Sequence, residues 1–385
     1  MNFMGYRRAN GTVGTRNHVL IFPTVICASA TADMISRTVP GTVAVTHPHG
    51  CGHMGIETEL IVRSMSGFCA NPNVAGVLLV GLGCELITPQ VIAEKLAAFG
   101  QRYEIVSIQD EGGTTATIEK GRLLAEKLLK EAALVVREPA DISELIVGTN
   151  CGGSDTFSGL TANPALGNAC DRLVAEGGTT ILSETPEMIG AEQVLSGRAA
   201  SESVKKRIYE ITSATEDLAF KAGVDIRGSE PSPGNIEGGL TTLEEKSLGA
   251  VLKGGTTEIR QVVDFAERPS EKGLVIMDGP AHDAVCNTGM IASGAQVIVF
   301  TTGRGTPMGA PTVPVIKVAT NSRIYQHMND NMDIDAGMIL EGTETVESTG
   351  ERIFQEIIEV ASGKATKAEI LGHHEFAIHS LGLSV

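Results

Sequence analysis

Short aliphatic runs recur along the chain, and each is followed by glycines and polar residues and then by a segment with helical spacing. The runs 18–24 (HVLIFPT) and 145–148 (LIVG) are continuous in apolar residues, as is typical of strands buried inside a parallel sheet. Helical spacing follows in 56–67, 89–99 and 117–133. This alternation favours an α/β fold with mostly parallel sheets.

The alternation is interrupted at 137–141 (REPAD). A chain of 385 residues is also too long for one ordinary domain. We therefore predict two domains with mostly parallel sheets. Residues 1–138 form an N-terminal α/β domain, a candidate dimerisation domain, and residues 139–385 form the C-terminal catalytic domain.

Three cysteines each follow a predicted buried strand and each lie beside at least one glycine: Cys51, Cys84 and Cys151. Strand ends of parallel sheets present side chains to a crevice where ligands bind. Three thiolates from separate loops could hold iron, as a single ion or as an iron–sulfur cluster with one iron open to substrate. The alternative is that these are small buried cysteines beside ordinary turns, since no CxxC pair is present.

Other polar side chains also follow the predicted strands. The segment TNCGGSD places Ser154 and Asp155 after Cys151. Arg304 lies between two glycines, where its guanidinium fork suits a carboxylate or sulfonate. Arg16 precedes the first strand and either faces a carboxylate or belongs to a solvated arm. Further candidates at strand ends or in a capped helix are His47, His49, Lys246, Thr302 and Asn321.

The composition restricts the class of protein. The formal net charge is −16, which argues against binding to nucleic acid or to an anionic membrane. No apolar run reaches the length of a membrane span, and the N-terminus has no apolar signal core. The 7 cysteines have no disulfide-scaffold spacing. We therefore expect a cytoplasmic protein with a small-molecule substrate. The nucleotide-binding patterns GxGxxG (after the first strand) and GxxxxGK[ST] and the GxSxG elbow are absent.

Taken together, these segments resemble the altronate and galactarate dehydratase family. The resemblance rests on GTVGTRNHVLIFPT, THPHGCG, VGLGCE, QDEGGTT, TNCGGSDTFSGLTANPALG, EGGLTTLEEKSLG and FTTGRG, and it covers nearly the whole chain. It implies a Rossmann-like variant for the C-terminal domain, a requirement for iron and reducing conditions, and an iron-dependent lyase activity. In such a reaction a proton leaves C2 of a 2-hydroxy acid, the group on C3 is expelled, and a 2-oxo acid forms.

Single-chain members of this family carry a small SAF-type domain before the catalytic part, whereas here the catalytic motifs begin at the first residues. The resemblance therefore implies a separate small (alpha) subunit and a homo-dimer or hetero-oligomer. The related sulfolactate sulfo-lyase, in which sulfite leaves C3, is divided in this way. We expect the large (beta) subunit of such an enzyme, and the alternative is the large subunit of a sugar-acid dehydratase.

The resemblance also suggests roles. Iron, held by Cys51, Cys84 and Cys151, would chelate the substrate, while Arg304 and Arg16 neutralise its carboxylate. Candidate acid–base groups are His47, His49, Lys246 and Asp155, and histidine is favoured because its pKa lies near working pH. Two other classes of protein are considered: a sugar-acid sensor, which needs no thiols, and a redox protein with Cys151 as nucleophile.

Overall fold

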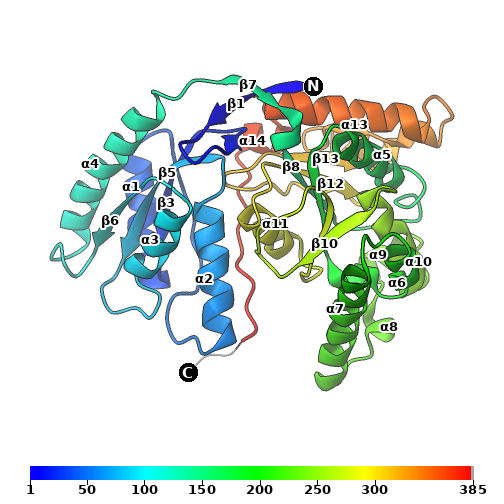
Figure 1. Ribbon diagram of the computed structural model, residues 1–385, viewed down its shortest axis with the longest axis horizontal. Coiled ribbons are helices and arrows are strands. Elements are labelled where there is room, and N and C mark those ends of the chain that lie inside the picture. The colour runs from blue at the N-terminus through cyan, green and yellow to red at the C-terminus, as the bar shows by residue number, and fades with distance from the viewer. Residues whose placement is uncertain (383–385) are drawn as a thin grey trace.

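The computed structural model describes residues 1–382 and has a large parallel sheet in the C-terminal half of the chain (Figure 1). Its strand order is β10-β11-β9-β8-β12-β13-β14. Without the edge strand β10, this is the 3-2-1-4-5-6 order of a Rossmann fold. The strands are β8 (Ile146–Cys151), β9 (Thr179–Leu182), β10 (Ile259–Val263), β11 (Gly273–Met277), β12 (Val297–Thr302), β13 (Val315–Ala319) and β14 (Ile334–Asp335).

A smaller parallel sheet lies in the N-terminal half, with the order β4-β3-β5-β6. Its strands are β3 (His18–Pro23), β4 (Thr42–Ala44), β5 (Val74–Gly81) and β6 (Tyr103–Ser107). Residues of β3 point alternately to opposite faces, as the pleat requires. Val19 and Ile21 pack with helices α1 (Ile26–Thr38) and α4 (Thr114–Ala132), and Leu20 and Phe22 pack with α2 (Ile56–Cys69) and α3 (Pro89–Ala98).

Both sheets confirm the predicted α/β class. Strand β3 begins at the first residue of the predicted range 18–24, and α3 ends one residue before the end of the predicted helical segment 89–99. The longest helix of the C-terminal half is α7 (Glu202–Lys221). Among residues 1–382, no helix is both long enough and apolar enough to cross a lipid bilayer.

The first residues contribute to the fold of both halves. Strand β1 (Asn2–Arg7) pairs antiparallel with β2 (Val13–Gly14) and β7 (Glu138–Asp141). Phe3 and Val13 are buried in the core of the C-terminal half. A solvated N-terminal arm, one of the two sequence-based alternatives, is therefore wrong, because Phe3 and Val13 need an apolar partner. The predicted division at 138/139 lies within β7.

Helices cover both faces of the large sheet. Helices α5 (Ala162–Ala175) and α13 (Val346–Ala361) pack together, and α11 (Asp283–Ala292) packs against α2 of the N-terminal half. The remaining helices are α6 (Glu192–Ser196), α8 (Ile226–Ser229), α9 (Pro233–Glu237), α10 (Leu243–Ala250), α12 (Ser322–His327) and α14 (Lys367–Leu371), with 3-10 turns η1 (Ile142–Glu144), η2 (Thr185–Met188), η3 (Val251–Gly254) and η4 (Gly337–Ile339).

From residue 373 to residue 382, the last that the structure describes, the chain has no regular secondary structure and runs between α2 and α11 (Figure 1, red). We call residues 373–382 the C-terminal strap. Phe376 packs against Phe22 and Phe68, with a centroid distance of 4.6 Å to Phe68. Near the end of the strap, Ser380 Oγ and the Leu381 amide both donate hydrogen bonds to the buried Glu57 carboxylate. The strap therefore fixes the two halves to each other.

Candidate active site

Cys151 is the last residue of β8, and Thr301 of β12 is its partner in the sheet. From β8 the chain continues to its neighbour β9, toward one edge of the sheet, and from β12 it continues to β13, toward the other edge. Strands β8 and β12 therefore flank the topological switch point. Parallel α/β sheets bind ligands outside the carboxyl ends of the strands at such a point. The topology therefore places Cys151 and the loop after β12 at the expected position of an active site.

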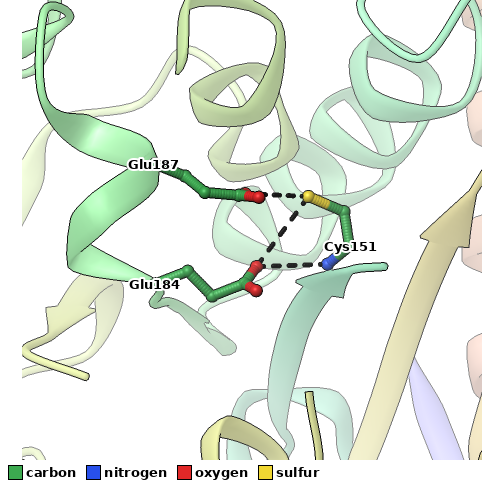
Figure 2. Close-up of side chains that lie close together, drawn as sticks. All are labelled: Cys151, Glu184 and Glu187. Carbon is green, nitrogen blue, oxygen red and sulfur yellow. Dashed lines mark hydrogen bonds between the residues drawn. The ribbon is translucent and has the colours of Figure 1, made fainter. Parts of the chain in front are cut away.

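Two carboxylates lie beside the Cys151 side chain (Figure 2). Cys151 Sγ is 2.9 Å from Glu187 Oε2, and the Cys151 amide donates to Glu184 Oε2 at 3.2 Å. Both glutamates follow β9, the strand next to β8. Glu184 has a left-handed backbone with φ of 72°, which is unfavourable for a residue with a side chain. The fold accepts this conformation and thereby turns the Glu184 carboxylate toward the end of β8.

A buried lysine lies among these three groups. Lys253, in η3, is only 1% exposed. Its ammonium is 2.5 Å from Cys151 Sγ, 3.0 Å from Glu184 Oε2 and 3.1 Å from Glu187 Oε2. A second lysine, Lys246 of α10, lies 3.3 Å from Glu187 and 2.8 Å from Glu230. We call Cys151, Glu184, Glu187 and Lys253 the buried quartet.

The pKa values in the quartet are displaced in opposite directions. Burial, together with the Glu187 carboxylate, raises the pKa of Glu184. Burial acts in the same sense on Glu187, but the two lysine ammoniums outweigh it and lower the pKa of that carboxyl. Burial likewise raises the pKa of the Cys151 thiol. Burial lowers the pKa of Lys253, but Cys151, Glu184 and Glu187 together outweigh burial and raise that pKa. The quartet therefore holds a Lys253–Glu187 ion pair beside a carboxyl group and a thiol that retain protons.

The sulfur of Cys151 and one oxygen each of Glu184 and Glu187 lie within 4.8 Å of one another, so this group could hold a metal ion. However, the Lys253 ammonium contacts all three ligand atoms. A metal would bring a second positive charge to the place that this ammonium occupies. The quartet as it stands is therefore neutralised by lysine and does not fit a metal ion.

Four of the residues predicted from the sequence lie close together beside the quartet. The Asp155 carboxylate accepts hydrogen bonds from Thr320 Oγ1 at 2.9 and 3.0 Å and from Asn321 Nδ2 at 3.0 Å. Thr302 Oγ1 accepts from the amides of the residues at 304 and 305. Ser154 Oγ lies 3.9 Å from Cys151 Sγ. Asp155 thus ties the loop after β8 to the loop after β13.

A pocket of about 330 Å³ opens next to these loops. Ser154, Asp155 and Lys246 line it together with apolar residues that include Leu240 and Leu252. A few polar groups among apolar ones are typical of a small-molecule site. Because Lys246 lines the pocket and also contacts Glu187, it connects the pocket with the buried quartet.

The two arginines predicted to bind substrate lie in different surroundings. Arg304 is exposed at the rim and pairs with Glu237 at 2.8 Å. Arg16 is bound inside the protein, where its guanidinium contacts the Glu369 carboxylate and the carbonyls of residues 15, 360 and 364. The carboxylate that Arg16 faces therefore belongs to the protein. This network joins the N-terminal half to α14.

The other predicted residues lie in the N-terminal half. Cys51 and Cys84 are exposed, and neither belongs to the group formed by Cys151 and the glutamates. His47 Nε2 donates to the Pro23 carbonyl at 2.7 Å, and its Nδ1 accepts from the His49 amide. Both ring nitrogens are thus engaged when the ring is neutral, and burial lowers the pKa of His47 to about 4.

The lowered pKa of His47 predicts that the stability of the protein depends on pH. Its folded-state pKa of about 4 lies below the ordinary value near 6.5, so between these values the unfolded chain binds the proton more tightly. Stability is therefore lost as the pH falls from about 6.5 to about 4, by about 2 kcal/mol at pH 5. We expect His47→Gln to lose less stability than the wild type between pH 7.5 and 5, measured by urea unfolding. The exposed His327→Gln is the control, and an unchanged pH dependence in His47→Gln would contradict a neutral buried ring.

Lys253, Glu184 and Glu187 are not among the site residues predicted from the sequence. The sequence gives only a weak indication that Lys253 belongs to a site, namely a single charged residue in the apolar, glycine-rich segment AVLKGG. A lone lysine between apolar residues is unusual, but its partners lie 69 and 66 residues away. No local pattern relates them.

Comparisons with known proteins agree with this architecture. Residues 5–133 match the model of the second domain of D-galactarate dehydratase/altronate hydrolase, and residues 142–384 match that of the D-galactarate/altronate dehydratase C-terminal domain. The chain is 40% identical to galactarate dehydratase (L-threo-forming) of Escherichia coli over 94% of its length and 73% of that protein. It is 36% identical to altronate dehydratase of Bacillus subtilis, covering 100% of this chain and 78% of that protein. It is 37% identical to the (2R)-sulfolactate sulfo-lyase subunit beta of Chromohalobacter salexigens, covering 98% of this chain and 97% of that protein.

An α/β fold with a pocket beside the loop after β8, together with relatives that are all dehydratases or sulfo-lyases, defines the protein as an enzyme of the lyase class. The chain belongs to the D-galactarate/altronate dehydratase family, which confirms the resemblance found in the sequence.

Proposed function

We propose that this enzyme is an iron-dependent lyase that converts a 2-hydroxy acid into a 2-oxo acid by expelling the group on C3. The observation that carries the proposal is the pocket beside the loop after β8, which Lys246 connects to the buried quartet, in a chain of this family. The seven free cysteines support a location in the reducing cytoplasm.

The chemistry requires cationic and proton-carrying groups. The C2 proton next to a carboxylate is weakly acidic, so positive charge must stabilise the anion that develops as the proton leaves. Lys246 supplies such a charge, since Glu187 and Glu230 together raise its pKa against the effect of burial. The C2–H electrons then form the C2=C3 bond, and the C3 group departs with its bonding pair. The resulting enol tautomerises to the 2-oxo acid.

Residues around the pocket have proposed roles in this reaction. Ser154, Thr302 and Asn321 would orient the substrate oxygens, and Asp155 would hold their loops in place. Arg304 at the rim would exchange Glu237 for the substrate carboxylate or sulfonate. Iron, when bound, supplies a Lewis acid for the substrate oxygens. Candidate acid–base groups are His49 and the groups of the buried quartet, among which a carboxyl of raised pKa such as Glu184 suits proton transfer near neutral pH. His47 is the weaker candidate, because both of its ring nitrogens are bound to the backbone.

For the substrate, we favour (2R)-sulfolactate, which would give pyruvate and sulfite. The nearly end-to-end match to a relative named subunit beta supports this choice. The name of this relative, which designates one subunit of an enzyme, also supports the presence of a small partner subunit. Dehydration of altronate or galactarate is the second candidate, favoured by the 40% identity to galactarate dehydratase.

A coupled assay that measures sulfite and 2-oxo acid together tests the proposal. We expect the chain purified without oxygen to release both products from sulfolactate once iron and the small partner are present. Without the partner the rate should fall at least about a hundredfold, because a site open to water loses both affinity and turnover. Release of 2-oxo acid from altronate or galactarate, with no sulfite from sulfolactate, would select the dehydratase. Full activity without a partner would contradict the two-subunit arrangement.

A further inference from the structure

The cysteines of the chain fall into two groups. All seven lie in the described residues, and Cys69, Cys151, Cys170 and Cys286 are buried. The exposed ones are Cys27, Cys51 and Cys84. Cysteine is among the most frequently buried residue types. Three exposed cysteines in the N-terminal half therefore need a reason other than packing.

These exposed cysteines follow three neighbouring strands of one sheet. Cys27 lies just after β3, Cys51 lies in the loop after β4, and Cys84 lies just after β5. The strands are adjacent and parallel in the order β4-β3-β5. All three residues therefore lie at the carboxyl edge of the N-terminal sheet. Strands β3 and β5 flank its switch point, which is the position where such sheets bind ligands.

Hydrogen bonds fasten the three loops to one another close to each cysteine. The Ile26 amide, next to Cys27, donates to the His49 carbonyl at 2.9 Å. The Ile87 amide donates to the carbonyl of Gly50, the residue before Cys51, at 3.0 Å. Thr24 Oγ1 donates to the carboxylate of Glu85, the residue after Cys84, at 3.0 Å. The backbones that carry the three thiols are thus held together without any thiol taking part.

Two further features distinguish these loops from ordinary turns. Gly50 has a φ of 112°, and a Cβ there would lie 2.2 Å from the Thr24 carbonyl oxygen, so the loops after β3 and β4 touch at this residue. At the end of the fourth strand, β6, the Gln109 side-chain amide donates to Cys84 Sγ at 3.5 Å. N–H donors to cysteine sulfur are a means by which proteins tune thiolate-bound iron.

Most histidine ring nitrogens beside these loops are already engaged. His47 binds the Pro23 carbonyl and the His49 amide, and His53 Nε2 accepts from the Gly50 amide. His49 bonds to the backbone at Ile378 of the strap. His47 therefore has no free ring nitrogen for a metal ion, whereas His53 Nδ1 is buried without a hydrogen-bond partner among the described residues. The three loops themselves each carry one thiol.

The spacing of the three thiols does not suit a single ion bound by all of them. Among the described residues, the three cysteines do not form a group whose ligand atoms all lie within 4.8 Å of one another. Donors around one ion are closer than that, since Zn–S bonds of about 2.3 Å place them about 4 Å apart. An iron–sulfur cluster spans more widely spaced sulfurs.

We propose that Cys27, Cys51 and Cys84 bind a [4Fe–4S] cluster with one iron left without a protein ligand. The proposal deepens the proposed function, on whose iron requirement it rests. It replaces Cys151 of the sequence-based set, whose neighbours already include the Lys253 ammonium, by Cys27. The exposed position leaves the fourth iron accessible to a small oxygen ligand.

The experiment is anaerobic reconstitution of the full chain with ferrous iron, sulfide and a thiol reductant. We measure iron, acid-labile sulfide and visible absorption per chain. Cys27→Ser, Cys51→Ser and Cys84→Ser should each lose at least about nine-tenths of the bound iron and sulfide, because a hydroxyl is a poor ligand for iron–sulfur clusters. Cys151→Ser and Cys286→Ser are the matched controls and should keep wild-type content. Circular dichroism confirms that each variant is folded.

Wild-type cluster content in Cys27→Ser would overturn the assignment, as would loss of the cluster in Cys151→Ser with its fold intact. Iron or zinc bound without sulfide would also overturn it. These readouts do not depend on turnover. A chain that carries the cluster on the three cysteines but yields no 2-oxo acid from any of the tested acids contradicts only the proposed function.

Discussion

Replacing Lys253 with methionine is expected to destabilise the protein by about 3–5 kcal/mol and to abolish activity. Methionine nearly preserves the length of the side chain but removes the ammonium that contacts Cys151, Glu184 and Glu187. The lowered pKa of Glu187 rests first among its charges on this ammonium, and removal of one partner leaves a buried carboxylate without its main counter-charge. Urea unfolding and the coupled assay measure the two effects.

Two variants make this result specific. Lys206→Met removes a lysine whose side chain is 78% exposed, and it should stay within about 0.5 kcal/mol of the wild type. Adding Glu187→Gln to Lys253→Met removes the carboxylate that has lost its counter-charge and should restore part of the stability, although not the activity. Wild-type stability of Lys253→Met would show that the quartet is not held together by this charge.

The double substitution Phe376→Ala with Ile378→Ala is expected to destabilise the protein by more than about 4 kcal/mol, since each large-to-small change in a core costs about 2–5 kcal/mol. Phe376 packs against Phe22 and Phe68 in the N-terminal half. Ile378 is 5% exposed and belongs to a core cluster that includes residues of both halves. Urea unfolding followed by circular dichroism measures the loss.

Ile370→Ala serves as the matched control for the strap, because Ile370 is 70% exposed and its truncation leaves no cavity. It should change stability by less than about 0.5 kcal/mol. If the double variant were as stable as this control, the strap would be an attached tail and not part of the shared core.

The sequence was sufficient to predict the strands and the loops that follow them. Apolar runs such as HVLIFPT indicate buried strands, and the residues after such runs, including Cys51, Cys84 and Cys151, do lie at carboxyl edges. The pattern carries no information about which sheet a strand joins. Cys51 and Cys84 belong to the small sheet and Cys151 to the large one, so their similar surroundings in sequence did not imply a common position.

Other parts of the site could not be predicted, because they depend on contacts between residues that are far apart in the sequence. Lys253 gains its role only when η3 packs beside β8 and β9, and an isolated lysine in an apolar segment otherwise suggests a surface residue. Cys27 stands among small residues at the start of α1, where a cysteine normally packs. Arg16 was expected to face the carboxylate of a substrate, but it faces that of Glu369, which lies 353 residues away.

The C-terminal strap has a consequence for the order in which the protein matures during its synthesis. Ser380 and its partner Glu57 are 323 residues apart. At the usual bacterial and eukaryotic rates of translation, about 5–20 residues per second, roughly 15–65 s separate their emergence. Throughout this interval Phe22 and Phe68 lack the aromatic ring that covers them in the finished protein. The N-terminal half therefore leaves the ribosome with an apolar surface that a chaperone can bind, and the strap ends that exposure.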